Sequence, residues 1–288
     1  MKTTRCFMAV AFILLFTACS NENDFENAYT PEEGEIQLVM IHPNQTRATD
    51  TSFEANDSIG VYVTVSDTQL QLAGNEVNNE LFTYNGTNWT SARKVYWNNG
   101  RHNVYAYYPY CRTINDTENY SFAVSTDQST YRGYTRSDFL WAAVADVEGG
   151  NEPVAMQFAH KMSSAVVTLE KGENYEGDIP EDAEVYILST VNKALIDLST
   201  GDVCKDYYAA TASIRCRKMS RTTYQAIVVP QSLTSRRPLV EIVAGNVSYL
   251  VEGKISYQQG MRHNIVVTLD KNPEKIEIEI GGSVDGWN

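Results

Sequence analysis

The chain has 288 residues and a formal net charge of -13, with 36 acidic side chains against 23 basic ones. A surface this acidic repels phosphate backbones, which argues against nucleic acid as a partner. The 18 Tyr, 9 Phe and 4 Trp favour a fold built from strands, because aromatic side chains fit a pleated, half-buried surface.

The N-terminus has the pattern of a secretory signal peptide. Lys2 and Arg5 form a basic head, an apolar run follows over residues 7–16, and Ala18-Cys19 comes next. A run of about ten apolar residues is too short for a bilayer core, which needs about 20. Ala18-Cys19 resembles the lipobox of bacterial lipoproteins, which predicts a lipid such as palmitate on Cys19. An ordinary cleaved signal peptide is the alternative.

Composition shifts divide the rest of the chain. After a signal peptide over 1–18, residues 19–34 are polar and acidic and hold one Pro and one Gly, which predicts a flexible tether. The Gly- and Pro-containing stretch 149–153 is the strongest internal break. We therefore expect an N-terminal domain over 35–150 and a C-terminal domain over 151–288.

Alternation with a period of two predicts strands through most of the chain. Turn signals such as Asn85-Gly86 and Gly245-Asn246 separate them. Many short strands at this spacing indicate an all-β fold of antiparallel β-sandwiches, and no amphipathic helix of three turns appears. The predicted strands span 36–41, 59–65, 104–108, 120–124, 139–145, 164–169, 184–189, 207–214, 224–229, 239–243, 247–251, 265–269 and 276–280.

Cysteine count limits the disulfides. Cys6 would leave with the signal peptide and Cys19 would carry lipid, so three cysteines remain. Three is odd, so at most one internal disulfide can form. Cys204 and Cys216 are the candidates in an oxidising compartment, and buried free thiols are the alternative.

No motif predicts catalysis, a metal site or a cofactor. The sequence lacks GxSxG, HExxH, GxGxxG and P-loop patterns, and its four His are not spaced as metal ligands. We therefore expect a protein that is not an enzyme. Trp89 and Trp97 belong to the densest aromatic region and could stack on sugar rings, although packing in a sandwich core is the alternative.

A set of aromatic segments occurs in a fixed order and resembles one family. The segments are DSIGVY (57–62), Trp89, VYW (95–97), VYAYYPY (104–110), DFLWA (138–142), FAHKMS (158–163) and AIVVPQ (226–231). Together with the lipobox, they resemble the fimbrillin family of Bacteroidetes, the subunits of type V pili. The resemblance implies two tandem transthyretin-like β-sandwich domains, export as an outer-membrane lipoprotein, and a place in a cell-surface fimbrium.

The resemblance also implies assembly by strand exchange. In the family, an Arg-specific protease releases the first strand, and a strand from another pilus subunit fills the vacated groove. Arg47, followed by Ala48, matches the cleavage position after the predicted strand 36–41, although Arg47 could be an ordinary loop residue. The strand 276–280 is either the last strand of the fold or a donated strand. Stalk, tip and accessory roles remain open. The alternative is a surface adhesin that binds host glycan or protein through aromatic loops.

Overall fold

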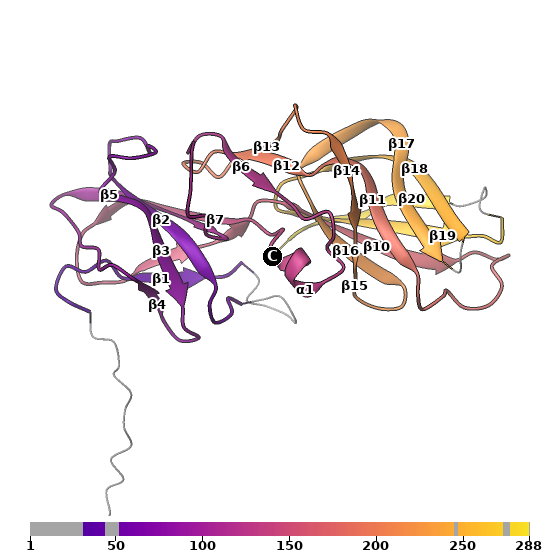
Figure 1. Ribbon diagram of the computed structural model, residues 1–288, viewed down its shortest axis with the longest axis horizontal. Helices are drawn as coiled ribbons and strands as arrows, with labels where there is room; N and C mark the ends of the chain where they lie inside the picture. Colours follow the sequence, from indigo (N-terminus) through magenta and orange to yellow (C-terminus); the bar gives the residue numbers. More distant parts are fainter. Residues whose placement is uncertain (1–30, 44–51, 245–246, 273–276, 288) are drawn as a thin grey trace, which may run out of the picture. The chain divides into compact units, whose positions relative to one another are not determined.

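The computed structural model describes residues 31–43, 52–244, 247–272 and 277–287. Within these residues the protein forms twenty strands and one short helix, α1 (Tyr131–Thr135) (Figure 1). The predicted all-β fold class is therefore confirmed. None of the described residues belongs to a helix that is long and apolar enough to span a bilayer. The predicted signal peptide, Cys19, Arg47 and Ala48 lie outside the described residues.

Two sheets are built from strands that precede the 149–153 stretch together with the two short strands that follow it. The larger has six strands, in hydrogen-bonded order β4 (Trp89–Ser91), β3 (Val77–Tyr84), β2 (Ser58–Val65), β5 (Arg101–Tyr108), β7 (Leu140–Glu148) and β9 (Ala159–His160). The smaller pairs β1 (Leu38–Ile41) with β8 (Val154–Gln157) in parallel. Their facing side chains form the N-terminal core. Its members are Ile36, Leu38, Met40, Ile59, Val61, Val63, Val77, Phe82, Val95, Val104, Ala106, Leu140, Ala142, Met156 and Phe158.

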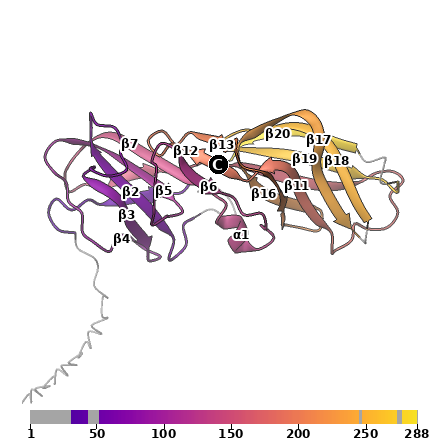
Figure 2. The ribbon, with the colours of Figure 1, turned by 45° about the horizontal axis from the view of Figure 1, so that its top comes forward.

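Three further sheets hold the remaining strands. The five-stranded sheet has the order β15 (Arg217–Lys218), β16 (Thr223–Val228), β10 (Ser163–Lys171), β19 (Met261–Leu269) and β20 (Glu277–Gly286). The four-stranded sheet has the order β14 (Thr211–Arg215), β11 (Glu184–Val191), β17 (Gln231–Ala244) and β18 (Val247–Tyr257). The three-stranded sheet has the order β13 (Val203–Lys205), β12 (Lys193–Ile196) and β6 (Tyr120–Ala123). In both ribbon views β17 and β18 run side by side as a hairpin (Figures 1 and 2).

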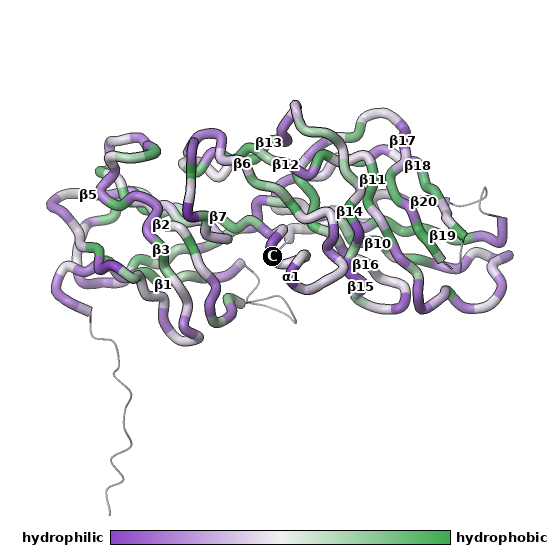
Figure 3. The backbone as a smooth tube through the Cα atoms, in the orientation of Figure 1, coloured by the Kyte–Doolittle hydropathy of each residue, from purple (hydrophilic) through white to green (hydrophobic). Residues whose placement is uncertain are grey.

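A larger C-terminal core fills the space between these sheets. Its buried members include Tyr62, Tyr107, Phe139, Val167, Ile187, Ile242 and Ile265. Hydrophobic stretches follow the strands, and hydrophilic stretches gather in the loops between them (Figure 3). The division into two domains at residues 150 and 151, and the tandem transthyretin-like arrangement, remain predictions.

The strand β2 is buried on both faces, although its alternation predicts one exposed face. Val61 and Val63 point into the N-terminal core, whereas Tyr62 belongs to the C-terminal core. The side chains of the neighbouring strand β5 also enter both cores, since Ala106 belongs to the N-terminal core and Tyr107 to the C-terminal core. Gly60 is required here, because a Cβ at this position would lie 2.2 Å from Cε1 of Tyr107. The centre of the six-stranded sheet therefore borders both cores.

The predicted strand over 207–214 is only partly correct. Residues 206–209 form a turn in which the Asp206 carboxylate accepts a hydrogen bond from the Tyr208 N–H at 2.9 Å. Local bonding of an Asp side chain to nearby backbone competes with strand pairing. Tyr207 and Tyr208 are consequently 77% and 100% exposed, and strand β14 begins only at Thr211.

Candidate functional site: the slot of the first strand

The segment 34–41, which contains β1, has backbone neighbours on both sides, at different positions along its length. Along one edge it pairs in parallel with β8, from Leu38 opposite Val154 to Ile41 opposite Gln157. Along the other edge, the preceding residues pair with the segment after β4. The Ile36 N–H donates to the Val95 carbonyl at 2.9 Å. Segment 34–41 therefore fills a gap between two chain segments, and both would lose a partner if it left.

The side chains of this segment alternate between the N-terminal core and the surface. Ile36, Leu38 and Met40 are 4%, 8% and 9% exposed, whereas Val39 is 49% exposed. Burying one aliphatic side chain of this size stabilises a fold by about 1.5–3 kcal/mol. The three residues together hold β1 in an apolar slot, and the alternation sets the register of whatever strand occupies it.

Polar contacts hold the start of this segment. The Gly34 N–H donates to Oδ1 of Asn151 at 2.9 Å, and Nε2 of Gln37 donates to the Asn151 carbonyl at 3.2 Å. Nζ of Lys94 lies 3.4 Å from Oε2 of Glu35, whose side chain is only 5% exposed. The stretch that the sequence marks as a domain break thus contacts the residues that lead into the first strand.

The far end of β1 leads into an aromatic cluster. The His42 ring meets Phe53 edge-to-face at 5.0 Å between centroids, and Phe53 meets Trp89 in the same way at 5.0 Å. Burial lowers the pKa of His42 to about 4, with Asp138 acting in the opposite direction and His160 adding to the decrease. His42 and Phe53 flank residues 44–51 in the sequence, so the two ends of the segment that contains Arg47 lie close together.

The two tryptophans singled out as sugar-stacking candidates have different surroundings. Trp89, with Tyr84, Phe53 and the β1 residues, lines a groove of about 280 Å³. The Trp97 and His102 rings lie 5.0 Å apart between centroids. A Cβ added to Gly149 would lie 2.8 Å from the Cβ of Trp97. Both tryptophans are partly buried against the N-terminal core. Sugar stacking by either residue remains a prediction, and Trp89 has a groove beside it.

The last strand lies within its own sheet. Strand β20 pairs antiparallel with β19, with Ile278 opposite Val267 and Glu279 opposite Val266. It is the edge strand of the five-stranded sheet. Trp287, which follows it, is 4% exposed. Residues 277–280 of the alternating segment predicted at 276–280 therefore begin a longer strand, most of which the periodicity of the sequence did not indicate.

The disulfide considered between Cys204 and Cys216 is not present. Cys111, Cys204 and Cys216 are free thiols, and Cys204 is exposed on β13 whereas Cys216 is buried in the C-terminal core. Burial raises the pKa of the Cys216 thiol far above its usual range. Cys216 thus behaves as a small apolar side chain, which is the alternative that the sequence left open.

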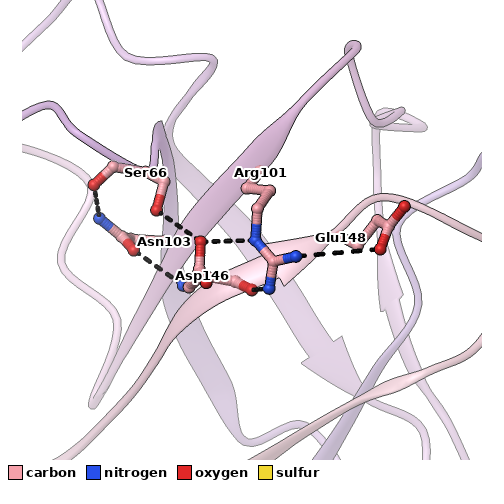
Figure 4. Close-up of polar contacts among 5 residues, drawn as sticks. All are labelled: Ser66, Arg101, Asn103, Asp146 and Glu148. Atoms are coloured by element: carbon pink, nitrogen blue, oxygen red, sulfur yellow. Dashed lines mark hydrogen bonds and ion pairs between the residues drawn. The ribbon is translucent and has the colours of Figure 1, made fainter.

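An exposed polar cluster links β5, β7 and the residue after β2 in the six-stranded sheet (Figure 4). Nε of Arg101 donates to Oδ1 of Asp146 at 2.6 Å, and Oγ of Ser66 donates to the same oxygen at 3.1 Å. The Asp146 N–H donates to Oδ1 of Asn103 at 3.0 Å. Hydrogen bonds from Arg101 and then Ser66 lower the pKa of Asp146.

This cluster has a structural explanation. Asp146 has a positive φ of 59°, and the register of β5 and β7 shifts between His102 and Val104. The side chains therefore tie together a β-bulge. The described residues do not contain a group of three or more His, Cys, Asp or Glu side chains placed to hold a metal ion.

Comparison with known families gives one match over most of the chain. The model of the fimbrillin-like family matches residues 46–287. Among curated proteins, a provisionally named fimbrium subunit, Fim1C, of Bacteroides uniformis is 25% identical over the whole of this chain and 96% of its own length. A provisionally named fimbrium tip subunit of Bacteroides ovatus is 26% identical over 70% of this chain, which spans 43% of that relative.

Solved structures share the fold at low sequence identity. A provisionally named cell adhesion protein of Bacteroides ovatus superposes with a TM-score of 0.71 and 19% identity, over 90% of this chain and 99% of that one. A similarly named protein of Bacteroides uniformis superposes with a TM-score of 0.68 and 22% identity, over 88% and 100%. At these identities the likeness concerns the fold alone.

Proposed function

This chain belongs to the fimbrillin-like family, and we propose that it is a structural subunit of a cell-surface fimbrium that joins other subunits by exchange of its first strand. The observation that carries the proposal is the slot of β1. A segment held between two backbone neighbours, with Leu38 and Met40 buried and Val39 exposed, can be replaced by any strand with the same alternation. A replacing strand would satisfy the unpaired backbone groups and the apolar slot together.

The trigger is cleavage after Arg47. This residue follows β1 in the sequence and precedes β8 and every strand of the six-stranded sheet, so a cut there separates β1 from the remainder of the fold. After the cut, β1 is held only by noncovalent contacts, and its effective concentration beside the slot falls once it dissociates. A strand from a neighbouring subunit can then compete for the slot.

Mass spectrometry after limited treatment with an Arg-specific protease tests this step. We expect a first cut between Arg47 and Ala48, followed by loss of the N-terminal peptide and the appearance of oligomers in size-exclusion chromatography. Arg47→Gln is the control, and it should stay monomeric after the same treatment. A cleaved chain that loses its N-terminal peptide and remains monomeric at high concentration would contradict strand exchange.

Lipid on Cys19 would place the precursor at the outer membrane before cleavage. The cut after Arg47 would also remove this anchor, because Cys19 lies upstream of it. Metabolic labelling with palmitate tests the proposal. The label is expected on the full chain, absent from Cys19→Ala and lost from the main fragment after cleavage. A main fragment that keeps the label would contradict this order of events.

A second candidate function is glycan binding by the groove beside Trp89. The groove of about 280 Å³ combines the Trp89 and Tyr84 rings with the polar side chains of Thr87 and Asn88, a mixture suited to sugar rings. A glycan array with Trp89→Ala and, as the matched variant, Trp97→Phe tests it. Binding lost only in Trp89→Ala supports an adhesin, and equal binding by both variants contradicts this site.

A further inference from the structure

Trp287 is unusually well enclosed for a residue next to the C-terminus of the chain. Its indole stacks on the His160 imidazole with 3.9 Å between centroids and 6° between planes. The backbone N–H of Trp287 donates to the Gly260 carbonyl at 2.9 Å. A parallel stack at this distance brings many ring atoms into van der Waals contact and so gives the pair dispersion attraction. The end of β20 is thus held by one specific ring contact as well as by strand pairing.

His160 is in turn held from several sides. It lies on β9, opposite Leu140 of β7, and its Nδ1 lies 2.9 Å from Oδ1 of Asp138. The His42 ring meets it edge-to-face at 5.9 Å. His42 directly follows β1, so the residue at the end of the first strand contacts the ring on which Trp287 is stacked.

A backbone contact connects the same two regions. The Phe158 N–H donates to the Ile41 carbonyl at 2.9 Å, and Phe158 lies two residues before His160. The parallel ladder between β1 and β8 ends at this bond. Removing β1 would therefore take away the ring of His42 and the ladder that fixes the backbone leading to His160.

We propose that β1 acts as a latch on the C-terminal strand: while β1 is docked, His160 is fixed and Trp287 stays stacked, and once β1 leaves, Trp287 and the end of β20 are released. The proposal rests on the function proposed above, because it requires a state in which β1 is absent. The element with two states is β1 itself, which is either docked or removed. His160 loses its ring contact with His42 when β1 is removed.

The latch gives assembly an order. Strand β20 is an edge strand whose sheet neighbour is β19, so loosening its end exposes backbone groups that another strand can pair with. An uncleaved subunit keeps both terminal strands occupied. A subunit that has lost β1 offers an empty slot and a loosened last strand together, and the fitting partner is a second subunit of the same fold.

Hydrogen exchange of the peptide 277–287, followed by mass spectrometry, tests the latch in the uncleaved protein. His42→Ala is expected to speed exchange of this peptide by roughly three- to ten-fold, because an aromatic contact of this kind shifts a local opening equilibrium by about that factor. Val39→Thr is the matched control: it lies on β1 with an exposed side chain and should leave exchange unchanged. Trp287→Ala sets the exchange rate of a fully released end.

The outcomes separate the latch from the strand-exchange proposal. Unchanged exchange of 277–287 in His42→Ala and in a second variant, His42→Asn, overturns the latch, whatever the protease experiment gives. Faster exchange in either variant, with Val39→Thr unchanged, supports it even if Arg47 is never cleaved. In protein from which the peptide preceding Ala48 has been removed, exchange should approach that of Trp287→Ala, and unchanged protection there also overturns the latch.

Discussion

The first and last strands are both terminal elements of this fold, yet they are held by different forces. Strand β1 is four residues long and depends on its ladder to β8 and on the buried side chains of Leu38 and Met40, with Ile36 just before it buried and bonded to Val95. Strand β20 is ten residues long and depends on a ladder to β19 and on the stacking of Trp287. A short strand in a slot leaves as a unit, whereas a long edge strand frays from its end.

Leu38→Asp should give the largest effect, because it breaks the slot. It places an unpaired carboxylate among the apolar side chains of the N-terminal core, and the strand should leave the slot to avoid that cost. We expect the free energy of unfolding to fall by about 3 kcal/mol, measured by urea denaturation. Val39→Asp, at the exposed neighbouring position, should cost less than about 0.5 kcal/mol. Equal losses in the two variants would contradict the slot.

Trp287→Ala should give the next largest effect, because it removes the stack that closes β20. We expect a loss of about 2 kcal/mol, because both the burial of the indole and its contact with the His160 ring are lost. Trp287→Phe retains a ring over His160 and should recover at least half of this loss. Thermal denaturation of both variants measures the difference, and identical melting temperatures for Ala and Phe would show that stacking is unimportant.

Acid should loosen β1 through His42. Its pKa is about 4 in the fold and 6.5 in an unstructured chain, so between these values the undocked state binds more protons. The stability of the docked state is complete above pH 6.5 and is lost as the pH falls toward 4, by on the order of 2 kcal/mol.

Comparing His42→Asn with the unsubstituted chain isolates this titration. His263 on β19 also has a pKa lowered by burial, so some acid sensitivity should remain in the variant. Urea midpoints at pH 7 and pH 4.5 should differ less for His42→Asn than for the unsubstituted chain. An equal pH dependence in both would assign the effect to other groups, such as His263.

Lys94→Met should give the smallest effect and sharpens the view of how β1 begins. It removes the ammonium group 3.4 Å from the buried Glu35 carboxylate while keeping a side chain of similar length. We expect a loss of about 1 kcal/mol, together with faster hydrogen exchange at residues 34–37. The same substitution at the exposed Lys254, which lies on β18, should change neither quantity.

The local pattern of the sequence was sufficient to find the first strand, the start of the last strand and the all-β fold class. Alternation over 36–41 and 276–280 is a property of neighbouring residues, so it can be read without knowing what the strands pair with. The ordered aromatic segments likewise predicted the family that the comparison then showed. The same approach missed the turn at 206–209: the β-propensity of Tyr207 and Tyr208 predicted a strand, whereas the Tyr208 N–H donates to the Asp206 carboxylate and forms a turn.

Partners distant in sequence were decided only by the tertiary structure. Nothing local indicates that β1 pairs with β8, more than a hundred residues away, or that Tyr62 and Val61 enter different cores. The separation of Cys204 from Cys216 and the stacking of Trp287 on His160 depend in the same way on chain segments meeting in space. Periodicity determines which face of a strand is apolar, whereas packing of the whole chain determines what that face meets.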